Sequence, residues 1–240
     1  MDLQNKIAFV TGASGGIGKE ICIALASEKV KVVLFGGNNV ERLTQTANCI
    51  KELGGECEVF AGNLTNATEL ESLFESAIKK VGGIDILINN AGLAQGKPFE
   101  QISIDEFDAI MNLNVRVPFL LTQKALPYLE KSNSASVVNV ASVVAHEGYP
   151  NQSIYTASKH ALLGMTKSLA KEVYKKGIRV HAVSPGGVYT DMIKITRPDL
   201  TPEGMPTAKD VADIIIFLIK NRTNAVIDEI RFHRASKEPF

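Results

Sequence analysis

The chain has 240 residues, 45% of them hydrophobic, which is enough for a substantial core. Its 26 basic and 26 acidic residues cancel, so nothing in the charge suggests a nucleic-acid or anionic-membrane partner. No apolar run approaches the roughly 18 residues of a membrane span. The opening MDLQNKIAFVTG is read as a strand, not a signal peptide. The three cysteines, Cys22, Cys49 and Cys57, form no C-x-x-C pair, so we expect a reduced, cytoplasmic chain.

Short β-branched runs alternate along the chain with stretches of helical periodicity. Strands are expected at 6–11, 31–35, 57–61, 84–90, 136–142, 178–184 and 226–232. Helices are expected near 16–28, 40–53, 66–81, 103–112, 117–131, 153–176 and 209–221. This alternation predicts parallel β-α-β units with right-handed crossovers. No repeat or boundary interrupts it, so we expect one domain over 1–240, with a tail, ASKEPF, that is loose or packed on a neighbouring subunit.

Residues 11–18, TGASGGIG, follow the first expected strand and open the first expected helix. Gly12 permits a tight turn, Gly16 lets a ligand approach the backbone, and Gly18 lets the helix pack close to the sheet. The free N–H groups of the helix N-terminus can then bind a diphosphate. A purely structural turn is the alternative, but the position between strand and helix favours a dinucleotide site.

Two further segments fall where such a sheet binds its ligand. NNAG, at 89–92, ends the fourth expected strand at the carboxyl edge, although Asn and Gly also form ordinary turns. Asn63 and Leu64 follow the third strand and could flank an adenine ring, although this dipeptide alone carries little weight.

Tyr155 and Lys159, in SIYTASKHALLGM, lie four residues apart and so share one face of a helix. A nearby cation lowers the pKa of a tyrosine towards the range useful for proton transfer. Ser142, at the end of the fifth strand, can hold a substrate oxygen in line with the tyrosine. Asn114 can fix a helix kink and bind a water that carries protons away from Lys159. Each residue alone has a simpler explanation, but their order along one sheet indicates nicotinamide-dependent chemistry.

The segments TGASGGIG, NNAG, NLN, YTASK and SPGGVYTDM, with the strand-end serine, together resemble the short-chain dehydrogenase/reductase family from residue 5 to about 232. The resemblance implies an α/β fold: a single-domain, doubly wound Rossmann sheet of seven parallel strands in the order 3-2-1-4-5-6-7. It also implies a general acid/base (Tyr155), a lysine that lowers its pKa (Lys159), a ligand for the substrate oxygen (Ser142) and a proton relay (Asn114).

The resemblance and the glycine turn together define the residues expected around the ligands, with no metal among them. The expected cofactor groove comprises Gly12, Ser14, Gly16, Ile17, Gly18, Gly37, Asn38, Asn63, Leu64, Asn90, Ala91, Gly92, Tyr155, Lys159, Pro185, Gly186, Val188 and Thr190. The expected substrate pocket comprises Ser142, Val143, Tyr149 and Tyr155, while His146 is expected at a loop surface.

The usual markers of cofactor choice are missing from VVLFGGNNVERL, at the end of the second strand. Gly36 stands where an acid would bind the ribose 2′-OH of NAD, and Gly37 where an arginine would bind the 2′-phosphate of NADP. The second basic position, in the glycine turn, is Gly15. Groups that can still hold an anion are the backbone N–H groups of Gly37 and Asn38 and the side chains of Asn38, Asn39 and Arg42. We favour NADP(H), with NAD(H) as the alternative.

The substrate is expected to be a small carbonyl or alcohol compound. The segment 188–210 contains three prolines that oppose a long helix, and it is shorter than in many fatty-acid-type members of the family, so we expect the lid to cover less of the cleft. Overall the chain resembles 3-oxoacyl-[acyl-carrier-protein] reductases and broad carbonyl reductases, but its ending, VIDEIRFHRASKEPF, lacks the glycines of the acyl-carrier type.

Reduction of 3-oxoacyl groups on an acidic acyl carrier is the alternative, and Lys97, Lys194 and Arg197 would have to supply its basic docking surface. A redox-silent nucleotide-binding regulator is less expected, because the serine, tyrosine and lysine are all present. The resemblance also implies a homodimer or homotetramer formed through the helices at 117–131 and 153–176.

Overall fold

The computed structural model describes residues 1–196 and 199–238. Seven parallel strands form one sheet in the order β3-β2-β1-β4-β5-β6-β7, which confirms the predicted topology. The strands are β1 (Ile7–Thr11), β2 (Lys31–Gly36), β3 (Cys57–Ala61), β4 (Ile86–Asn89), β5 (Ser136–Val140), β6 (Arg179–Pro185) and β7 (Glu229–Phe232). β1 lies between β2 and β4, so the direction of winding reverses there and the carboxyl ends of these strands leave room for a ligand.

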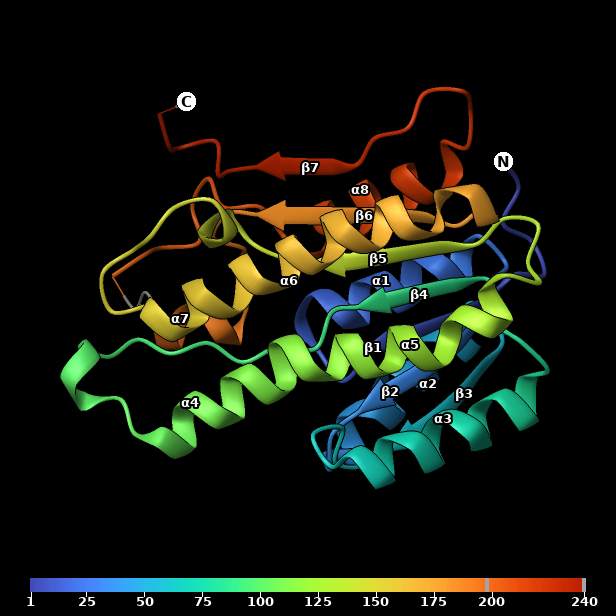
Figure 1. Ribbon diagram of the computed structural model, residues 1–240, viewed down its shortest axis with the longest axis horizontal. Coiled ribbons are helices and arrows are strands. Elements are labelled where there is room, and N and C mark those ends of the chain that lie inside the picture. The colour runs from blue at the N-terminus through green and yellow to red at the C-terminus, as the bar shows by residue number, and fades with distance from the viewer. Residues whose placement is uncertain (197–198, 239–240) are drawn as a thin grey trace.

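Helices cover both faces of the sheet (Figure 1). The helices are α1 (Gly16–Ser27), α2 (Val40–Glu52), α3 (Ala67–Val81), α4 (Ile104–Met111), α5 (Val117–Leu129), α6 (Ser153–Val173), α7 (Asp191–Thr196) and α8 (Ala208–Lys220). Residues of α1, α2 and α8 contribute to the hydrophobic core on one face, and residues of α3, α5 and α6 to the core on the other. None of the helices within the described ranges combines the length and apolarity needed to cross a membrane.

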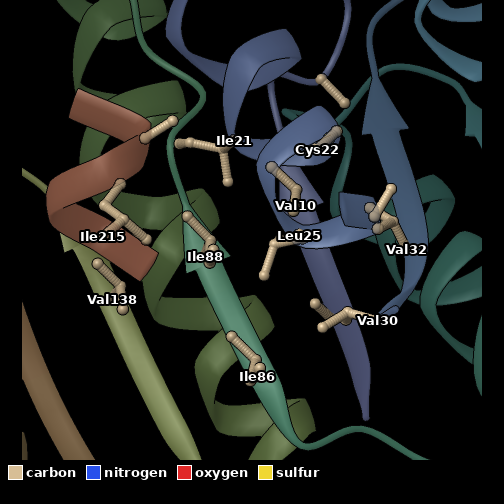
Figure 2. Close-up of a cluster of buried hydrophobic side chains, with 14 of the residues drawn as sticks. Val10, Ile21, Cys22, Leu25, Val30, Val32, Ile86, Ile88, Val138 and Ile215 are labelled. Carbon is tan, nitrogen blue, oxygen red and sulfur yellow. The ribbon is translucent and has the colours of Figure 1, made fainter. Parts of the chain in front are cut away.

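The strand sequences separate these two cores. In β1, Ala8 and Val10 belong to one core and Phe9 to the other, because successive side chains of a strand point to opposite faces. Figure 2 shows Ile21 and Leu25 of α1 directed at the sheet, and both are fully buried. Burial of each such side chain contributes about 1.5–3 kcal/mol, so this packing holds α1 against the sheet.

Three segments refine the expected boundaries. A π-helical turn, Asn112–Arg116, joins α4 to α5, which is the irregularity expected at MNLNV. The last strand begins at Glu229 rather than at 226, and Arg179, at the start of β6, bonds instead to the carbonyl groups of Asn221 and Thr223. β7 therefore pairs with β6 only from Ala182 onwards. The lid contains just the short helix α7, as the prolines predict, although Arg197 and Pro198 lie outside the described residues.

Candidate active site

The glycine turn is locked to the end of β4. Thr11 accepts hydrogen bonds at Oγ1 from the backbone N–H groups of Asn90 and Ala91, both at 3.0 Å. Asn90 donates from Nδ2 to the carbonyl of Thr11 at 3.0 Å. Gly12 has a φ of 69°, and a Cβ on Gly18 would lie 2.1 Å from the Gly12 carbonyl oxygen. TGASGGIG and NNAG therefore form one rigid unit that accepts no side chain at Gly18.

A cleft of about 440 Å³ opens above this unit. Sixteen of the expected ligand-binding residues line it: Gly12, Ser14, Gly16, Ile17, Asn90, Ala91, Gly92, Ser142, Val143, Tyr149, Tyr155, Lys159, Pro185, Gly186, Val188 and Thr190. The structure thus brings together segments from the ends of β1, β4, β5 and β6.

Six expected residues do not line the cleft. They are Gly18, Gly37, Asn38, Asn63, Leu64 and Asn114. Gly18 supports the turn from behind, and the Asn63 side chain accepts bonds from Thr65. Leu64 is buried in the core. Contacts of these residues with an adenine or ribose remain a prediction.

Tyr155 and Lys159 lie on α6 facing the cleft, as their spacing predicts. The Lys159 ammonium lies 5.8 Å from the centroid of the Tyr155 ring and donates a 2.8 Å hydrogen bond to the carbonyl of Val140. Ser142, just beyond β5, donates a 3.4 Å bond from Oγ to the carbonyl of Pro185. Tyr155 is held from behind, because its backbone N–H donates to the side chain of Gln95 at 2.9 Å.

The expected lowering of the Tyr155 pKa is wrong for this arrangement. Burial raises the pKa of Tyr155 above its ordinary value of 10.0, and the neighbouring Ser142 hydroxyl opposes this only in part. Lys159 is bonded to Val140 rather than to the phenol. Burial lowers its own pKa to about 8, so it is mostly an ammonium at pH 7. The side chains therefore present a protonated phenol next to a destabilised cation.

Asn114 joins three parts of the site. It is fully buried, accepts a bond from the Leu93 N–H, and donates to the Leu93 carbonyl and to Ser158 Oγ, at 2.8, 2.8 and 2.9 Å. A Cβ on Gly92 would lie 3.3 Å from Asn114 Oδ1 and 3.6 Å from Lys159 Nζ. Asn114 thus braces the chain after β4 against α6 beside the lysine, while its role in a proton relay remains a prediction.

At the opposite end of the cleft, Arg42 covers the glycine turn. A Cβ on Gly15 would lie 3.3 Å from its guanidinium nitrogen Nη2, and this group forms a 3.1 Å ion pair with Asp191. A side chain at Gly36 would require the buried Leu43 side chain to move, because a Cβ there would lie 2.7 Å from it. The Asn39 side chain is occupied as the N-cap of α2. Arg42 is therefore the cation closest to the second basic position of the family.

The carboxyl-terminal tail, which starts at His233 after β7, lines the other end of the cleft and contacts its own chain, while packing of ASKEPF on a neighbouring subunit stays a prediction. The backbone N–H of Ala235 donates to the carbonyl of Gly204 at 3.0 Å, and Lys237 lies 3.5 Å from Glu147 and 3.4 Å from the Tyr149 hydroxyl. Three tail residues that the sequence patterns did not single out line the cleft: His233, Arg234 and Lys237. Their position in the cleft could not be predicted from the sequence, because it depends on contacts with residues remote in the chain.

His146 faces a second, smaller pocket of about 270 Å³ on the other side of this tail. Its Nε2 lies 2.6 Å from Glu229, which also accepts a 2.6 Å hydrogen bond from Ser184. The residue does not line the main cleft, in agreement with the expectation of a loop position.

Comparisons with known proteins decide the family. The sequence model of the short chain dehydrogenase family matches residues 6–201. The chain belongs to the short chain dehydrogenase family. A 3-oxoacyl-[acyl-carrier-protein] reductase FabG from Thermotoga maritima is 33% identical over 240 residues, with 96% of each chain covered. An uncharacterized oxidoreductase of the same organism is 37% identical over 188 residues, covering 78% of this chain and 73% of its own.

Solved structures of other short chain dehydrogenases have the same architecture. A 3-ketoacyl-(acyl-carrier-protein) reductase from Brucella melitensis, complexed with NADH, superimposes with a TM-score of 0.88 at 28% identity, covering 96% of this chain and 98% of its own. A metagenomic short-chain oxidoreductase in complex with NADP gives 0.85 at 28% identity, covering 98% and 99%. This short chain dehydrogenase is therefore an oxidoreductase. Within its described residues, no group of three or more His, Cys, Asp or Glu side chains is arranged to hold a metal ion.

Proposed function

We propose that this short chain dehydrogenase interconverts a small carbonyl compound and the corresponding alcohol with a nicotinamide cofactor, using Tyr155 as general acid/base. The observation that supports this most strongly is the convergence of Ser142, Tyr155 and Lys159 on the cleft that the glycine turn opens. A regulator that only binds nucleotides would have no need for a phenol, a hydroxyl and an ammonium at the nicotinamide end.

The shape and charge of the cleft fit a dinucleotide. α1 begins at Gly16 without a side-chain cap and without an acid in its first turn, so its N–H groups are free to meet a diphosphate. Among the described residues, four cationic side chains and one carboxylate line the cleft: Arg42, Lys159, Arg234 and Lys237 against Asp191. A neutral chain thus concentrates positive charge in a cleft that can take anionic ligands.

When bound, a reduced nicotinamide supplies the hydride that a carbonyl carbon accepts. Tyr155 then gives its hydroxyl proton to the substrate oxygen, and its raised pKa keeps it in the protonated form that this step needs. Ser142 holds that oxygen through its hydroxyl. Lys159, mostly an ammonium at pH 7, stabilises the phenolate as it forms. In alcohol oxidation the same groups act in reverse and the Tyr155 phenolate accepts the alcohol proton, so the raised pKa of Tyr155 favours carbonyl reduction.

We favour NADP(H) over NAD(H). No carboxylate stands at the end of β2, and Arg42 lies over the glycine turn, where a guanidinium can pair with a 2′-phosphate after exchanging its exposed partner Asp191. Arg42→Gln should raise the KM for NADPH about tenfold and leave that for NADH within threefold. Lys51→Gln, in the last turn of the same helix, is the matched control. A tenfold preference of the wild type for NADH would contradict this assignment.

Reduction of a 3-oxoacyl group on an acyl carrier remains the second candidate, because relatives bearing that name are 30–33% identical. The lysines expected to dock an acidic acyl carrier favour a small-molecule substrate instead, because both are already engaged by carboxylates. Lys97 pairs with Glu106, and Lys194 shares Asp191 with Arg42, so neither lysine presents a cation free of a protein partner to an acidic acyl carrier. Arg197 lies outside the described residues.

We further propose a homodimer or homotetramer located in the cytoplasm. Large apolar side chains are exposed on and beside α4 and α5, including Ile104 at 75%, Phe99 at 73% and Phe119 at 50%. Large exposed apolar side chains are common at subunit contacts. Light scattering coupled to size-exclusion chromatography would detect the oligomer, and a monomer at micromolar concentration would contradict this proposal.

The direct test of the proposed function is a cofactor-oxidation screen over ketones, aldehydes, sugars and 3-oxoacyl thioesters, with NADPH and NADH. We expect turnover of small carbonyl compounds that disappears in Tyr155→Phe. Activity confined to acyl-carrier thioesters would favour the second candidate, and inactivity towards every carbonyl would contradict both.

A further inference from the structure

Arg234 carries a charge that the fold itself does not use. Its side chain is only partly exposed and lines the main cleft. In the described part of the chain, its guanidinium has neither a hydrogen bond nor an ion pair, whereas its backbone carbonyl accepts bonds from His233 Nδ1 and the Lys237 N–H. A partly exposed guanidinium that faces a cleft and has no protein partner is available to pair with an anion that arrives from outside.

The backbone fixes Arg234 at the catalytic end of the cleft. Gly186 donates its N–H to the carbonyl of Phe232 at 2.8 Å, and a Cβ on Gly186 would lie 3.6 Å from the backbone nitrogen of Arg234. Gly186 follows Pro185, whose carbonyl accepts the hydroxyl of Ser142. A short series of contacts thus joins Arg234 to the residue that holds the reacting oxygen. Arg42, which covers the glycine turn, marks the adenosine end instead.

The surrounding charges select the kind of anion. Lys237, the other tail cation of the cleft, is already engaged by Glu147 and the Tyr149 hydroxyl. One free guanidinium remains, and its two parallel N–H donors match the two oxygens of a carboxylate. A dianionic phosphate would leave part of its charge without a partner there.

Resting on the proposed function, we infer that the substrate is a small oxo acid or hydroxy acid whose carboxylate is bound by Arg234. The acid is held at one end by this guanidinium and at the other by Ser142 and Tyr155, so the reacting carbon is oriented from both sides. Arg234 is then a substrate-binding and specificity-determining residue from a segment that follows the last strand.

Matched substrate pairs test this inference. Initial rates with NADPH and with NADH are measured for short 2-oxo and 3-oxo acids, each against its own methyl ester, in wild type, Arg234→Gln and Arg231→Gln. Arg231 is the control, because it is an exposed arginine on β7 that does not line the main cleft. The dissociation constant of NADPH is measured for each variant by nicotinamide fluorescence.

Wild type should prefer the acid to its ester, and Arg234→Gln should lower kcat/KM for the acid by about 10- to 100-fold through KM. The ester and the NADPH dissociation constant should change by less than threefold, and Arg231→Gln should behave as wild type. Equal losses for acid and ester, or weaker NADPH binding, would overturn the inference and assign Arg234 to the cofactor.

Different results would contradict the carboxylate inference and the proposed function. Turnover of esters or neutral ketones without any preference for the acid would overturn the carboxylate inference and leave the proposed function intact. Inactivity towards both members of every pair and towards the wider carbonyl screen would contradict the proposed function and the inference together.

Discussion

Replacement of Lys159 by methionine tests whether the cleft holds a destabilised cation. The lysine side chain is 4% exposed, and burial lowers its pKa from 10.5 to about 8. The folded protein therefore releases this proton at a lower pH than the unfolded chain does, so the wild type gains stability as the pH rises from about 8 towards 10.5. At 1.36 kcal/mol per pKa unit, the gain between pH 7 and pH 10 is about 2.5 kcal/mol.

Urea denaturation of wild type and Lys159→Met at pH 7, 8, 9 and 10 measures this gain. Every other titrating group is shared, so its contribution cancels in the difference between the two proteins. Between pH 7 and pH 10, we expect the unfolding free energy of the wild type to rise by about 2.5 kcal/mol relative to that of the variant. Parallel profiles would show that the pKa of Lys159 is ordinary, and would refute the claim that its ammonium is desolvated. The variant should also bind NADPH more weakly, because the lysine is expected to contact the cofactor ribose.

Two further predictions concern residues that hold the site in place. Gly18→Ala should destabilise the fold by about 1–3 kcal/mol or more and weaken NADPH binding, because the new Cβ would lie 2.1 Å from the Gly12 carbonyl oxygen. Gly164→Ala is the control, because the space around Gly164 is open. Equal melting temperatures of the two variants would contradict the clash. His181 is buried, and burial is the main cause of its lowered pKa, so the folded protein should lose stability as the pH falls below 6.5. In urea denaturation, His181→Asn should therefore lose less unfolding free energy than the wild type between pH 7 and pH 5. Identical losses in the two proteins would contradict this prediction.

The sheet could be predicted from sequence because its signals are local. Apolar strand runs, the glycine turn and helix spacing all act over a few residues, and each element formed close to its expected range. The start of β7 could not, since the chain before Glu229 makes contacts with residues remote in sequence, such as the bonds from Arg179 to carbonyls more than forty residues away. The contacts of the tail within its own chain could not be predicted either, because its partners Gly204 and Tyr149 are remote in sequence.

In the candidate active site, too, features set by local spacing could be predicted and features set by the packing of distant segments could not. The i, i+4 spacing of Tyr155 and Lys159 places both on one helical face, so their shared orientation could be predicted. The direction of the Tyr155 pKa could not, because it depends on how much water the fold removes and on Lys159 bonding to Val140. Arg234 carries no motif at all, and only the contact of β7 with β6 brings it to the cleft.

The central claim is that the Tyr155 hydroxyl transfers the proton that completes hydride transfer. Turnover of the best carbonyl substrate and the dissociation constant of NADPH, measured together in Tyr155→Phe, test it most directly. We predict a fall in kcat of at least about 100-fold, with NADPH binding unchanged within threefold. Turnover close to that of the wild type would contradict the account.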